Sequence, residues 1–304
     1  MGRLERIPLS TRPKTTVWPL EGYIPPRRYP VTPSLALATD DPRATALAAA
    51  LEALGTEAFP QALAGWLGRE LAFDNVTTLA YRDGAAPEML YRAAAEPRVH
   101  ARLDSAYLEG AYLLDPFHQL HLDAAPDGLY RLQDIAPDHF TRGDYYLTYY
   151  AGTTLTDEIA YIASPTPGAS VTVCLGRDAS SGKRFSGRDL AEAARIAPVC
   201  FALMRRHWAG LHPGGAPAPD SDPVVDRLRR NAAARLGIEL TPRQAETAFL
   251  ILKGHSTASI ALRLDLSPQT VKVFRKQLYH RCAISSQAEL FSLFLPLLGA
   301  PEAR

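Results

Sequence analysis

The sequence predicts an α+β domain followed by a small all-α domain. Its 304 residues are enough for two domains of ordinary size, and an apolar content of 47% is enough for buried cores. Between residues 43 and 211 the patterns run helix, helix, hairpin, helix, helix, hairpin, helix. That order is typical of an antiparallel sheet with helices on its faces. Between residues 225 and 304, short amphipathic helices with capping signals follow one another.

Two segments without hydrophobic periodicity delimit these domains. Residues 1–42 include RIPLSTRPK and YIPPRRYPVTP, and their many prolines predict an extended arm rather than a packed element. Residues 212–224 include HPGGAPAPDSDP, a composition typical of a flexible tether. We therefore expect four parts in order: the arm, a domain over 43–211, the tether, and a domain over 225–304.

The formal net charge of +1 conceals an asymmetry along the chain. Residues 224–304 contain 12 lysines and arginines against 6 acidic residues, whereas the rest of the chain contains 21 against 26. A basic module on an acidic remainder predicts a polyanionic partner for the C-terminal domain alone.

Cysteine content and hydropathy predict a cytoplasmic protein. The three cysteines are too few and too far apart for a disulfide framework, which favours a reducing compartment. The sequence has no run of about 18 apolar residues, and its N-terminus lacks a secretory signal pattern. We therefore predict no membrane association.

The helices of the first domain are indicated by apolar residues that recur every three to four positions. They are expected at 44–55, 59–71, 104–122, 142–153 and 186–208. The strands are indicated by alternating or β-branched runs around turn residues. One hairpin covers 76–94 with Gly-Ala-Ala-Pro at its turn, and the other covers 157–178 around Pro167 and Gly168.

The helices of the second domain are marked by their ends. Thr241 and Pro242 are a good N-cap and first helical residue, and Gly254 suits the end of that helix. Ser256 caps a second helix, and Ser267 caps a third that begins with Pro268. The more apolar segment SSQAELFSLFLPLL, residues 285–298, predicts a fourth helix.

The third of these helices has two unlike faces. Val271, Phe274 and Leu278 recur at i, i+3 and i+7 and form a stripe that should be buried. The other side combines cations with polar and small apolar residues and carries no acid: Gln269, Lys272, Val273, Arg275 and Lys276. A solvated surface is the simplest interpretation of such a face, and a nucleic-acid contact is the alternative.

The arrangement of these helices carries a family resemblance. The residues L-T-P-R-x-x-E at 240–246 open a series that resembles the LuxR-type helix-turn-helix at the family's spacing. The series continues with Gly254, Ile260–Ala261, Leu264, Ser267, Thr270–Val271–Lys272 and Glu289–Leu290. The resemblance implies a four-helix DNA-binding domain whose third helix enters the major groove.

The same resemblance implies roles for individual residues. Lys272, Val273 and Lys276 would face bases, and Arg275 would lie against phosphates. Gln269 and Thr270, at the start of the helix, complete the expected contact set, because Gln can read adenine and Thr either base type. One such helix reads only a few base pairs, so we expect a homodimer on an inverted-repeat operator in double-stranded DNA.

The fourth helix has two possible roles in such a dimer. Its apolar residues could supply the dimer contact or could close the domain's own core: Leu290, Leu293, Phe294 and Leu297. RNA polymerase is a further candidate partner.

The N-terminal domain resembles bacterial sensor domains. Its order of elements is similar to that of GAF and PAS domains, and YLLDPF, residues 112–117, resembles a stretch of the autoinducer-binding domains. That resemblance implies that Asp115 accepts a hydrogen bond from a ligand amide and that Tyr112 lies beside it. Arg98 and Arg102 occupy the stretch where that family has Tyr and Trp, which argues against an acyl-homoserine lactone as the ligand.

A tyrosine cluster supports a small-molecule site in the same domain. Tyr145, Tyr146, Tyr149 and Tyr150 place four rings on one side of a predicted helix. They could pack on the sheet, or they could form a pocket wall that offers π-faces and hydroxyls to a ligand. With Asp115, Asp157 or Glu158 nearby, an amine would fit by charge pairing and cation–π contact.

Little in the sequence supports catalysis or metal binding. His118 and His121 are spaced i, i+3 on a predicted helix, but no third ligand stands at a recognisable spacing. No phosphate-binding loop or G-x-S-x-G motif is present. We predict no cofactor, no metal and no enzymatic activity.

The leading hypothesis is therefore a transcription regulator whose first domain senses a small-molecule effector and whose second domain reads DNA. In the alternative, the first domain is only a dimerisation or protein-interaction scaffold. An enzyme fused to a DNA-binding module is disfavoured by the missing catalytic residues.

Overall fold

The computed structural model describes residues 41–213 and 223–299. Residues 1–40 of the arm expected over 1–42, and most of the tether expected over 212–224, lie outside these ranges. Among the helices that the structure describes, none is long and apolar enough to cross a membrane.

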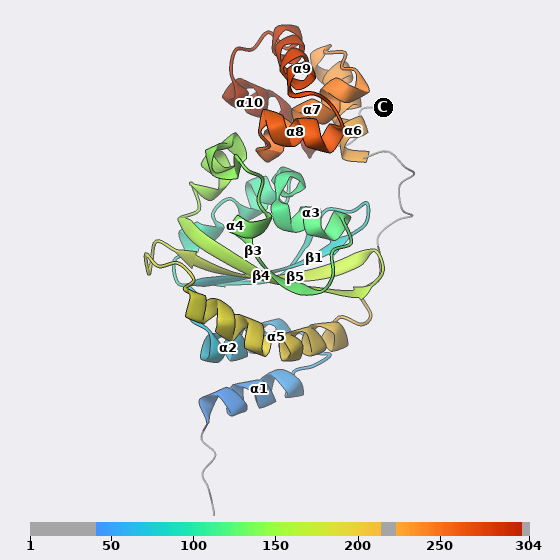
Figure 1. The fold of residues 1–304 in the computed structure, drawn as a ribbon. Coiled ribbons are helices and arrows are strands. Elements are labelled where there is room, and N and C mark those ends of the chain that lie inside the picture. Colours follow the sequence, from blue (N-terminus) through green and yellow to red (C-terminus); the bar gives the residue numbers. More distant parts are fainter. Residues whose placement is uncertain (1–40, 214–222, 300–304) are drawn as a thin grey trace, which may run out of the picture. The chain divides into compact units, whose positions relative to one another are not determined.

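The first domain is built on one antiparallel sheet of five strands (Figure 1). The strands are ordered β2-β1-β5-β4-β3. Their bounds are β1 Asn75–Arg82, β2 Glu88–Ala94, β3 Gly128–Arg131, β4 Leu155–Thr166 and β5 Ala169–Asp178. The two predicted hairpins are β1–β2 and β4–β5, and the latter turns at Pro167 and Gly168, as expected.

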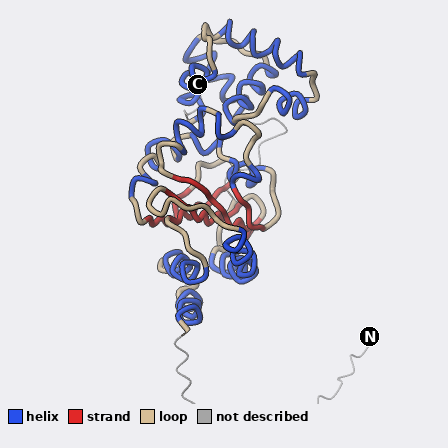
Figure 2. Tube along the Cα trace, turned by 60° about the vertical axis from the view of Figure 1, so that its left-hand side comes forward, coloured by secondary structure: helices blue, strands red, loops and turns tan. Residues whose placement is uncertain are grey.

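Helices cover both faces of this sheet, as Figures 1 and 2 show. One face carries α2 Phe59–Glu70 and α5 Gly187–His207, and α1 Pro42–Glu52 packs against α2 on the side away from the sheet. The other face carries α3 Pro116–Leu122, α4 Leu132–Ile135 and several short turns. Because side chains alternate along a strand, Ile159 and Tyr161 of β4 pack in the core under α5, whereas Ala160 and Ile162 pack in the core on the opposite face.

The segment 104–122, which the sequence predicts to be one helix, is a series of short pieces. The prediction of a single helix was therefore wrong. It consists of the π-turn η3 Leu103–Tyr107, the 3-10 turn η4 Ala111–Leu114, and α3. Gly110 has φ +151°, which no helix tolerates, and Asp115 is extended before Pro116. These two residues explain the breaks.

Three further differences separate the first domain from its predicted order. The aromatic segment 142–153 forms only the five-residue π-turn η6 Tyr146–Tyr150, preceded by the 3-10 turn η5 Phe140–Arg142. Another 3-10 turn, η2, covers Pro97–His100. The short strand β3 was not predicted, because its four residues are all half-buried and show no alternation.

The second domain contains the four predicted helices and one more. The predicted helices are α7 Pro242–Lys253, α8 Thr257–Leu264, α9 Pro268–Arg281 and α10 Gln287–Leu298. The unpredicted helix, α6 Pro223–Leu236, precedes them. The expected caps are present: Thr241 forms a capping box with Gln244, and Gly254 ends α7 with φ +92°.

Candidate functional site

The start of α9 is determined by two residues. The Ser267 hydroxyl accepts a hydrogen bond from the Thr270 amide at 3.0 Å, and Pro268 occupies the first helical position. The two hydroxyls of Ser267 and Thr270 also lie 2.8 Å apart. Thr270, predicted to contact DNA, is therefore half-buried and engaged in the cap.

One stripe of α9 is buried against the rest of its domain. Val271 and Leu278 are fully buried and Phe274 is half-buried, as the spacing predicts. The Gln244 side-chain amide of α7 donates to the Gln277 side-chain oxygen of α9 at 3.1 Å. Packing and this hydrogen bond fix the rotation of α9 about its axis, and hence which residues face outward.

The outward side of α9 presents the predicted base-contacting residues together. Gln269, Lys272 and Lys276 are exposed, and Val273 keeps 43% of its surface accessible. None of the ion pairs formed within residues 41–213 and 223–299 involves Lys272 or Lys276. Two cations without carboxylate partners, beside an amide and a methyl surface, are groups suited to phosphates and base edges.

Arg275 lies at the margin of this face. It is half-buried, its guanidinium donates to the Tyr279 hydroxyl at 3.3 Å, and it lies 5.8 Å from the centre of the Tyr279 ring. This contact holds the guanidinium against the Tyr279 side chain.

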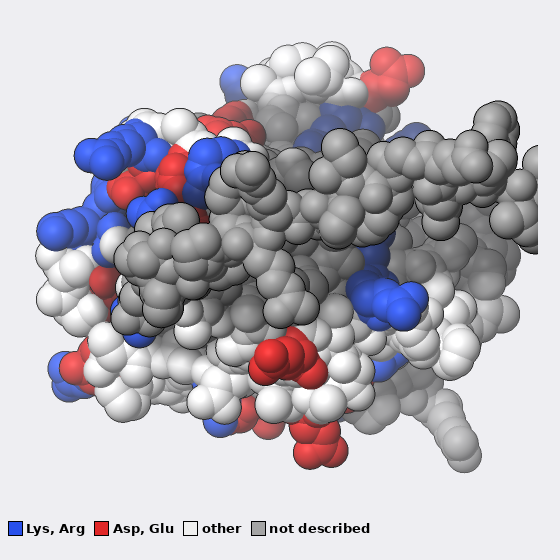
Figure 3. Space-filling view, turned by 90° about the horizontal axis from the view of Figure 1, so that it is seen from below, with Lys and Arg blue, Asp and Glu red and all other residues white. Residues whose placement is uncertain are grey.

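Charge is distributed differently at the α1 end of the molecule. Figure 3, seen from that end, shows basic and acidic side chains interspersed on the surface that the described residues form. On α5, for example, Arg195 pairs with Glu70 of α2 and with Glu192, at 2.7 Å in each case. Neighbouring charges of opposite sign cancel at a distance, so such a surface attracts DNA poorly.

The apolar side of α10 is already covered within one chain. Leu290 and Phe294 are fully buried, Leu297 is 4% exposed, and Leu293 is half-buried. Of the two interpretations of these residues, the structure shows the one in which they close the chain's own core.

A cavity in the first domain brings two predicted ligand residues together. It has a volume of about 50 Å³ and lies between the sheet and the turns η3 and η6. Asp115 and Glu158, which are 43 positions apart in the sequence, both line it. Two residues that the sequence analysis did not select also line it, Tyr107 and Cys174. Cys174 pairs with Ala160 of β4, and the two side chains lie on the same face of the sheet. The alternation of side chains along β5 was the sequence signal that could have identified Cys174.

Asp115 is held by donors from its own chain. Its carboxylate accepts from the Tyr107 hydroxyl at 2.5 Å and from the Phe117 amide at 2.8 Å, which makes it the N-cap of α3. Burial raises the pKa of Asp115 to about 6, although these two hydrogen bonds act in the opposite direction. The Tyr107 hydroxyl in turn lies 2.7 Å from that of Tyr81.

Glu158 has weaker partners in the same cavity. The Tyr150 hydroxyl donates to it at 3.4 Å, and the Cys174 thiol is its other hydrogen-bond partner. Burial raises the pKa of Glu158 to about 8, and the charge of Asp115 adds to the increase. At neutral pH this carboxyl is therefore mostly protonated.

The predicted tyrosine cluster forms an aromatic group around Phe140. Tyr145, Tyr146 and Tyr150 each meet the Phe140 ring edge-on, and Tyr146 stacks on Tyr150 with centroids 5.7 Å apart. Tyr146 and Tyr150 line a second pocket of about 280 Å³, and Tyr150 also lines the cavity of Glu158.

The other predicted ligand residues lie elsewhere. Tyr145 is fully buried within the aromatic group, and Tyr112 meets the His118 ring edge-on at 4.9 Å. Neither is among the residues that line the two pockets. Tyr149 belongs to η6, but its side chain is outside the described part of the structure.

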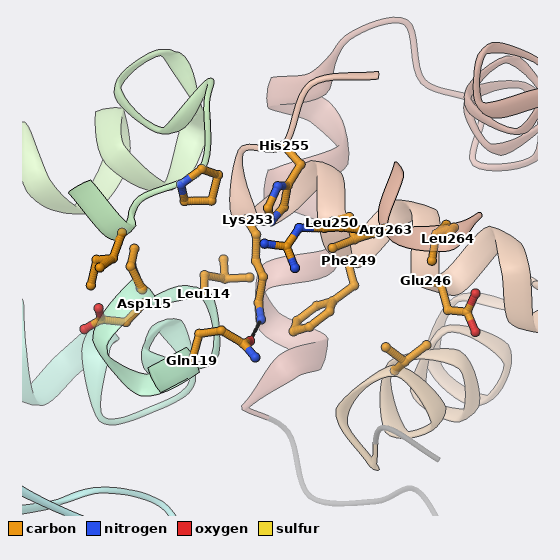
Figure 4. Close-up of a pocket in the computed structure, with 14 residues that line it drawn as sticks. Leu114, Asp115, Gln119, Glu246, Phe249, Leu250, Lys253, His255, Arg263 and Leu264 are labelled. Atoms are coloured by element: carbon orange, nitrogen blue, oxygen red, sulfur yellow. Dashed lines mark hydrogen bonds between the residues drawn. The ribbon is translucent and has the colours of Figure 1, made fainter. Parts of the chain in front are cut away.

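A third pocket, of about 280 Å³, lies between α3 and the helices α7 and α8 (Figure 4). Lys253 of α7 donates to the side-chain oxygen of Gln119 of α3, and its ammonium lies 4.5 Å from the centre of the Phe249 ring. His255 also lines the pocket, and burial together with Arg263 and Lys253 lowers its pKa to about 4. The Asp115 carboxylate points away from this pocket, as Figure 4 shows.

Of the two histidines spaced i, i+3, His121 has polar neighbours, whereas the Nδ1 atom of His118 is buried without a hydrogen-bond partner among the described residues. His121 Nδ1 lies 2.8 Å from the Ser170 hydroxyl, and its Nε2 lies 3.3 Å from Asp83. Burial lowers the pKa of His118 to about 3, so this histidine is neutral. Within the described residues, no three side chains of His, Cys, Asp or Glu are grouped as a metal site would require.

Comparison with solved structures finds proteins of bacterial origin. The ligand-binding domain of VqsR from Pseudomonas aeruginosa matches 54% of this chain and 94% of its own length, with 29% identity and a TM-score of 0.46. SdiA from Escherichia coli matches 84% of this chain and 95% of its own length, with 14% identity and a TM-score of 0.36.

Comparison of sequences identifies the family. Residues 239–294, which include α7, α8 and α9, match the model of the bacterial regulatory proteins of the luxR family. A protein of Aeromonas salmonicida encoded in the exeN 3′ region, and assigned to the HTH-type transcriptional regulators, is 31% identical over 191 residues. Those residues are 62% of this chain and 96% of the relative. The chain thus belongs to the DNA-binding transcriptional regulators of the luxR family and not to a family of enzymes.

Proposed function

We propose that this protein is a cytoplasmic transcription regulator that reads an inverted-repeat operator as a homodimer and responds to a small molecule bound in its first domain. The observation that carries the DNA-binding part is the exposed face of α9, where Gln269, Lys272, Val273 and Lys276 stand together. RNA polymerase is the expected partner on DNA if the regulator activates transcription.

The homodimer is inferred from the size of the reading surface. One recognition helix contacts only a few base pairs, and two half-sites about one helical turn apart give the affinity and specificity of an operator. Because the apolar side of α10 is buried within one chain, this proposal does not require α10 to form the dimer contact.

Ligand response is supported by the cavities of the first domain. A cavity holding two buried carboxyls lies beside an aromatic pocket of about 280 Å³, a size at the lower limit for small-molecule sites. Asp115 links this region to the second domain, because its backbone also lines the pocket that contains Lys253. A ligand that moved α3 would alter the contacts of α7.

The scaffold alternative is favoured by one observation. Asp115, the residue expected to bind a ligand amide, already accepts hydrogen bonds from Tyr107 and Phe117. A carboxylate satisfied in this way braces the fold without a ligand, and the first domain would then serve only to dimerise the chain.

Selection from a random duplex library with the full chain tests the DNA-binding part. Enriched sequences should be inverted repeats, and their affinity should fall steeply with salt through counterion release. The double substitution Lys272→Ala/Lys276→Ala should abolish the enrichment, whereas Lys183→Ala, in an exposed loop of the first domain, should leave it intact. No enriched sequence, or binding insensitive to salt, would contradict the proposal.

A thermal-shift screen of small molecules with the full chain tests the sensing part. A compound that binds only the folded state raises the melting temperature, and it should also change operator affinity. A domain that is stabilised by no compound at all supports the scaffold alternative.

A further inference from the structure

The cavity of the first domain combines two acids and no cation. Fourteen residues line it, and Asp115 and Glu158 are the only charged-type side chains among them apart from His100. Burial and the charge of Arg92 lower the pKa of His100, so this histidine does not supply a positive charge at neutral pH. Every other ionisable lining group, Tyr107, Tyr150 and Cys174, is neutral or negative.

Glu158 is in an unusual position for a structural carboxyl. It lies on β4 with neighbours on both sides, β5 and β3, and its side chain is on the face covered by η6 and α3. The Asp157 carboxylate beside it has a full set of partners, with Arg131 at 2.6 Å and the Phe185 amide at 3.0 Å. Glu158 has only the long Tyr150 contact and the Cys174 thiol.

A buried carboxyl without a cation is costly when ionised, and the chain keeps two of them on one cavity. Asp115 caps α3, but a structural role for Glu158 would be served equally well by a neutral side chain of the same volume, because its contacts with Tyr150 and Cys174 need no ionised carboxyl. A ligand that brings its own positive charge accounts for the arrangement.

The volumes of this cavity and of the neighbouring aromatic pocket limit the size and shape of that ligand. The cavity, at about 50 Å³, admits a head group no larger than a few water molecules. Tyr150 and Leu155 separate it from the aromatic pocket of about 280 Å³, which Phe140, Tyr146 and Leu132 also line. A small head and a flat apolar tail would occupy the two spaces once the Tyr150 side chain moves.

We propose that the first domain binds a primary amine with an aromatic tail, its ammonium group between Glu158 and Asp115 and its tail among Phe140, Tyr146 and Tyr150. This inference rests on the proposed sensing function and names the chemical class of its ligand. Anions are excluded by the two carboxyls, and neutral acyl chains leave both carboxyls without a counter-charge.

Proton release is the distinctive signature of this binding mode. The pKa of Glu158, about 8, leaves its carboxyl mostly protonated at pH 7, and an ammonium group stabilises the ionised form. Binding of an amine should therefore release about one proton per chain at pH 7. At pH 9, where Glu158 is already ionised, the same binding should release almost none.

The test compares two probes that differ in one group. Tyramine carries an ammonium, and tyrosol carries a hydroxyl on the same phenethyl frame. Isothermal titration of the full chain in buffers of different ionisation enthalpy measures both affinity and protons released. We expect tyramine to bind at least tenfold more tightly than tyrosol, the factor typical of a hydrogen bond to a charged group, with proton release for tyramine only.

Two variants locate the effect. Glu158→Gln is isosteric with the neutral acid and should fold, and it should lose the proton release and weaken the preference for tyramine, which Asp115 then supports alone. Glu88→Gln removes a carboxylate that pairs with Arg82 at the exposed edge of the sheet, and should behave as the unmodified chain. Equal affinity for the two probes, failure of tyramine to bind, or an unchanged Glu158→Gln variant would overturn the amine assignment.

The proposed sensing function is judged separately, by operator affinity measured with tyramine and with octanoyl-homoserine lactone. If the lactone but not the amine changes operator affinity, sensing holds and the amine assignment is wrong. If tyramine binds with proton release but leaves operator affinity unchanged, the amine site holds and the sensing function is wrong.

Discussion

Replacing Glu158 with glutamine should stabilise the protein, and the gain should grow with pH. The pKa of this carboxyl is 4.5 in an unfolded chain and about 8 in the cavity, chiefly because of burial. Between these values the folded chain binds more protons than the unfolded chain, so the free energy of unfolding falls as pH rises. Glutamine does not titrate, and it removes this loss.

The magnitude follows from the two pKa values. At pH 4.5 the carboxyl is protonated in the folded chain and half protonated in the unfolded chain, so the two proteins should differ little. At pH 7 the ionisable carboxyl costs about 3 kcal/mol, from 1.36 kcal/mol for each of the roughly 2.5 pH units above 4.5. Above pH 8 the cost reaches an upper bound of about 5 kcal/mol, which water entering the cavity would reduce.

Urea unfolding of both proteins at pH 5, 7 and 8.5 measures this difference. Trp66 and Trp208 are buried on the opposite face of the sheet, so their fluorescence reports unfolding of the first domain without touching the cavity. A variant that is less stable than the parent, or a difference independent of pH, would show that Glu158 is a structural hydrogen-bonding group and refute the reasoning.

Two pairs of substitutions test the contact face of α9 and the cap of α3. Lys276→Ala should cost about 1–3 kcal/mol of binding free energy at the selected operator and relax base preference, whereas Arg275→Ala should weaken binding to all sequences alike. Competition titrations against shuffled duplexes measure both effects. Equal, non-selective losses of affinity would contradict the assignment of faces. Asp115→Ala should lower the free energy of unfolding by about 1–2 kcal/mol, because the Phe117 amide loses its acceptor. Asp115→Asn should keep most of that stability, because its amide oxygen can still accept the hydrogen bond. Melting curves measure the difference, and an alanine variant as stable as the parent would exclude the capping role.

The second domain could be predicted from its sequence because its signals are local. Ser267 and Pro268 start α9, and Thr241 and Gly254 delimit α7, as these residue types do in most helices. The buried stripe of α9 follows from spacing alone. The helix α6 was not predicted, because it follows the Pro-rich tether and four of its fourteen residues are arginines.

The first domain was less predictable because its site depends on contacts between distant segments. Asp115 and Glu158 could be named as acids of interest, but nothing local shows that the start of α3 and strand β4 bring them to one cavity. The aromatic spacing at Tyr145 and Tyr146 indicated a helix, whereas packing around Phe140 gives a five-residue π-turn. The Tyr107 hydroxyl, which satisfies Asp115, had no signal in the sequence.

Consecutive residues of β4 belong to two separate cores, so substitutions at alternate positions of this strand have different consequences. Ile159 and Tyr161 pack with α2 and α5, whereas Ala160 and Ile162 pack in a cluster that also contains Phe249 and other residues of the DNA-binding helices. Substitutions on the first face change the stability of the sheet and leave the side chains of the second core unaltered. Substitutions on the second face can alter ligand preference and its transmission together. A lineage could therefore change its inducer by replacing every second residue of one strand while the alternate residues keep the domain folded.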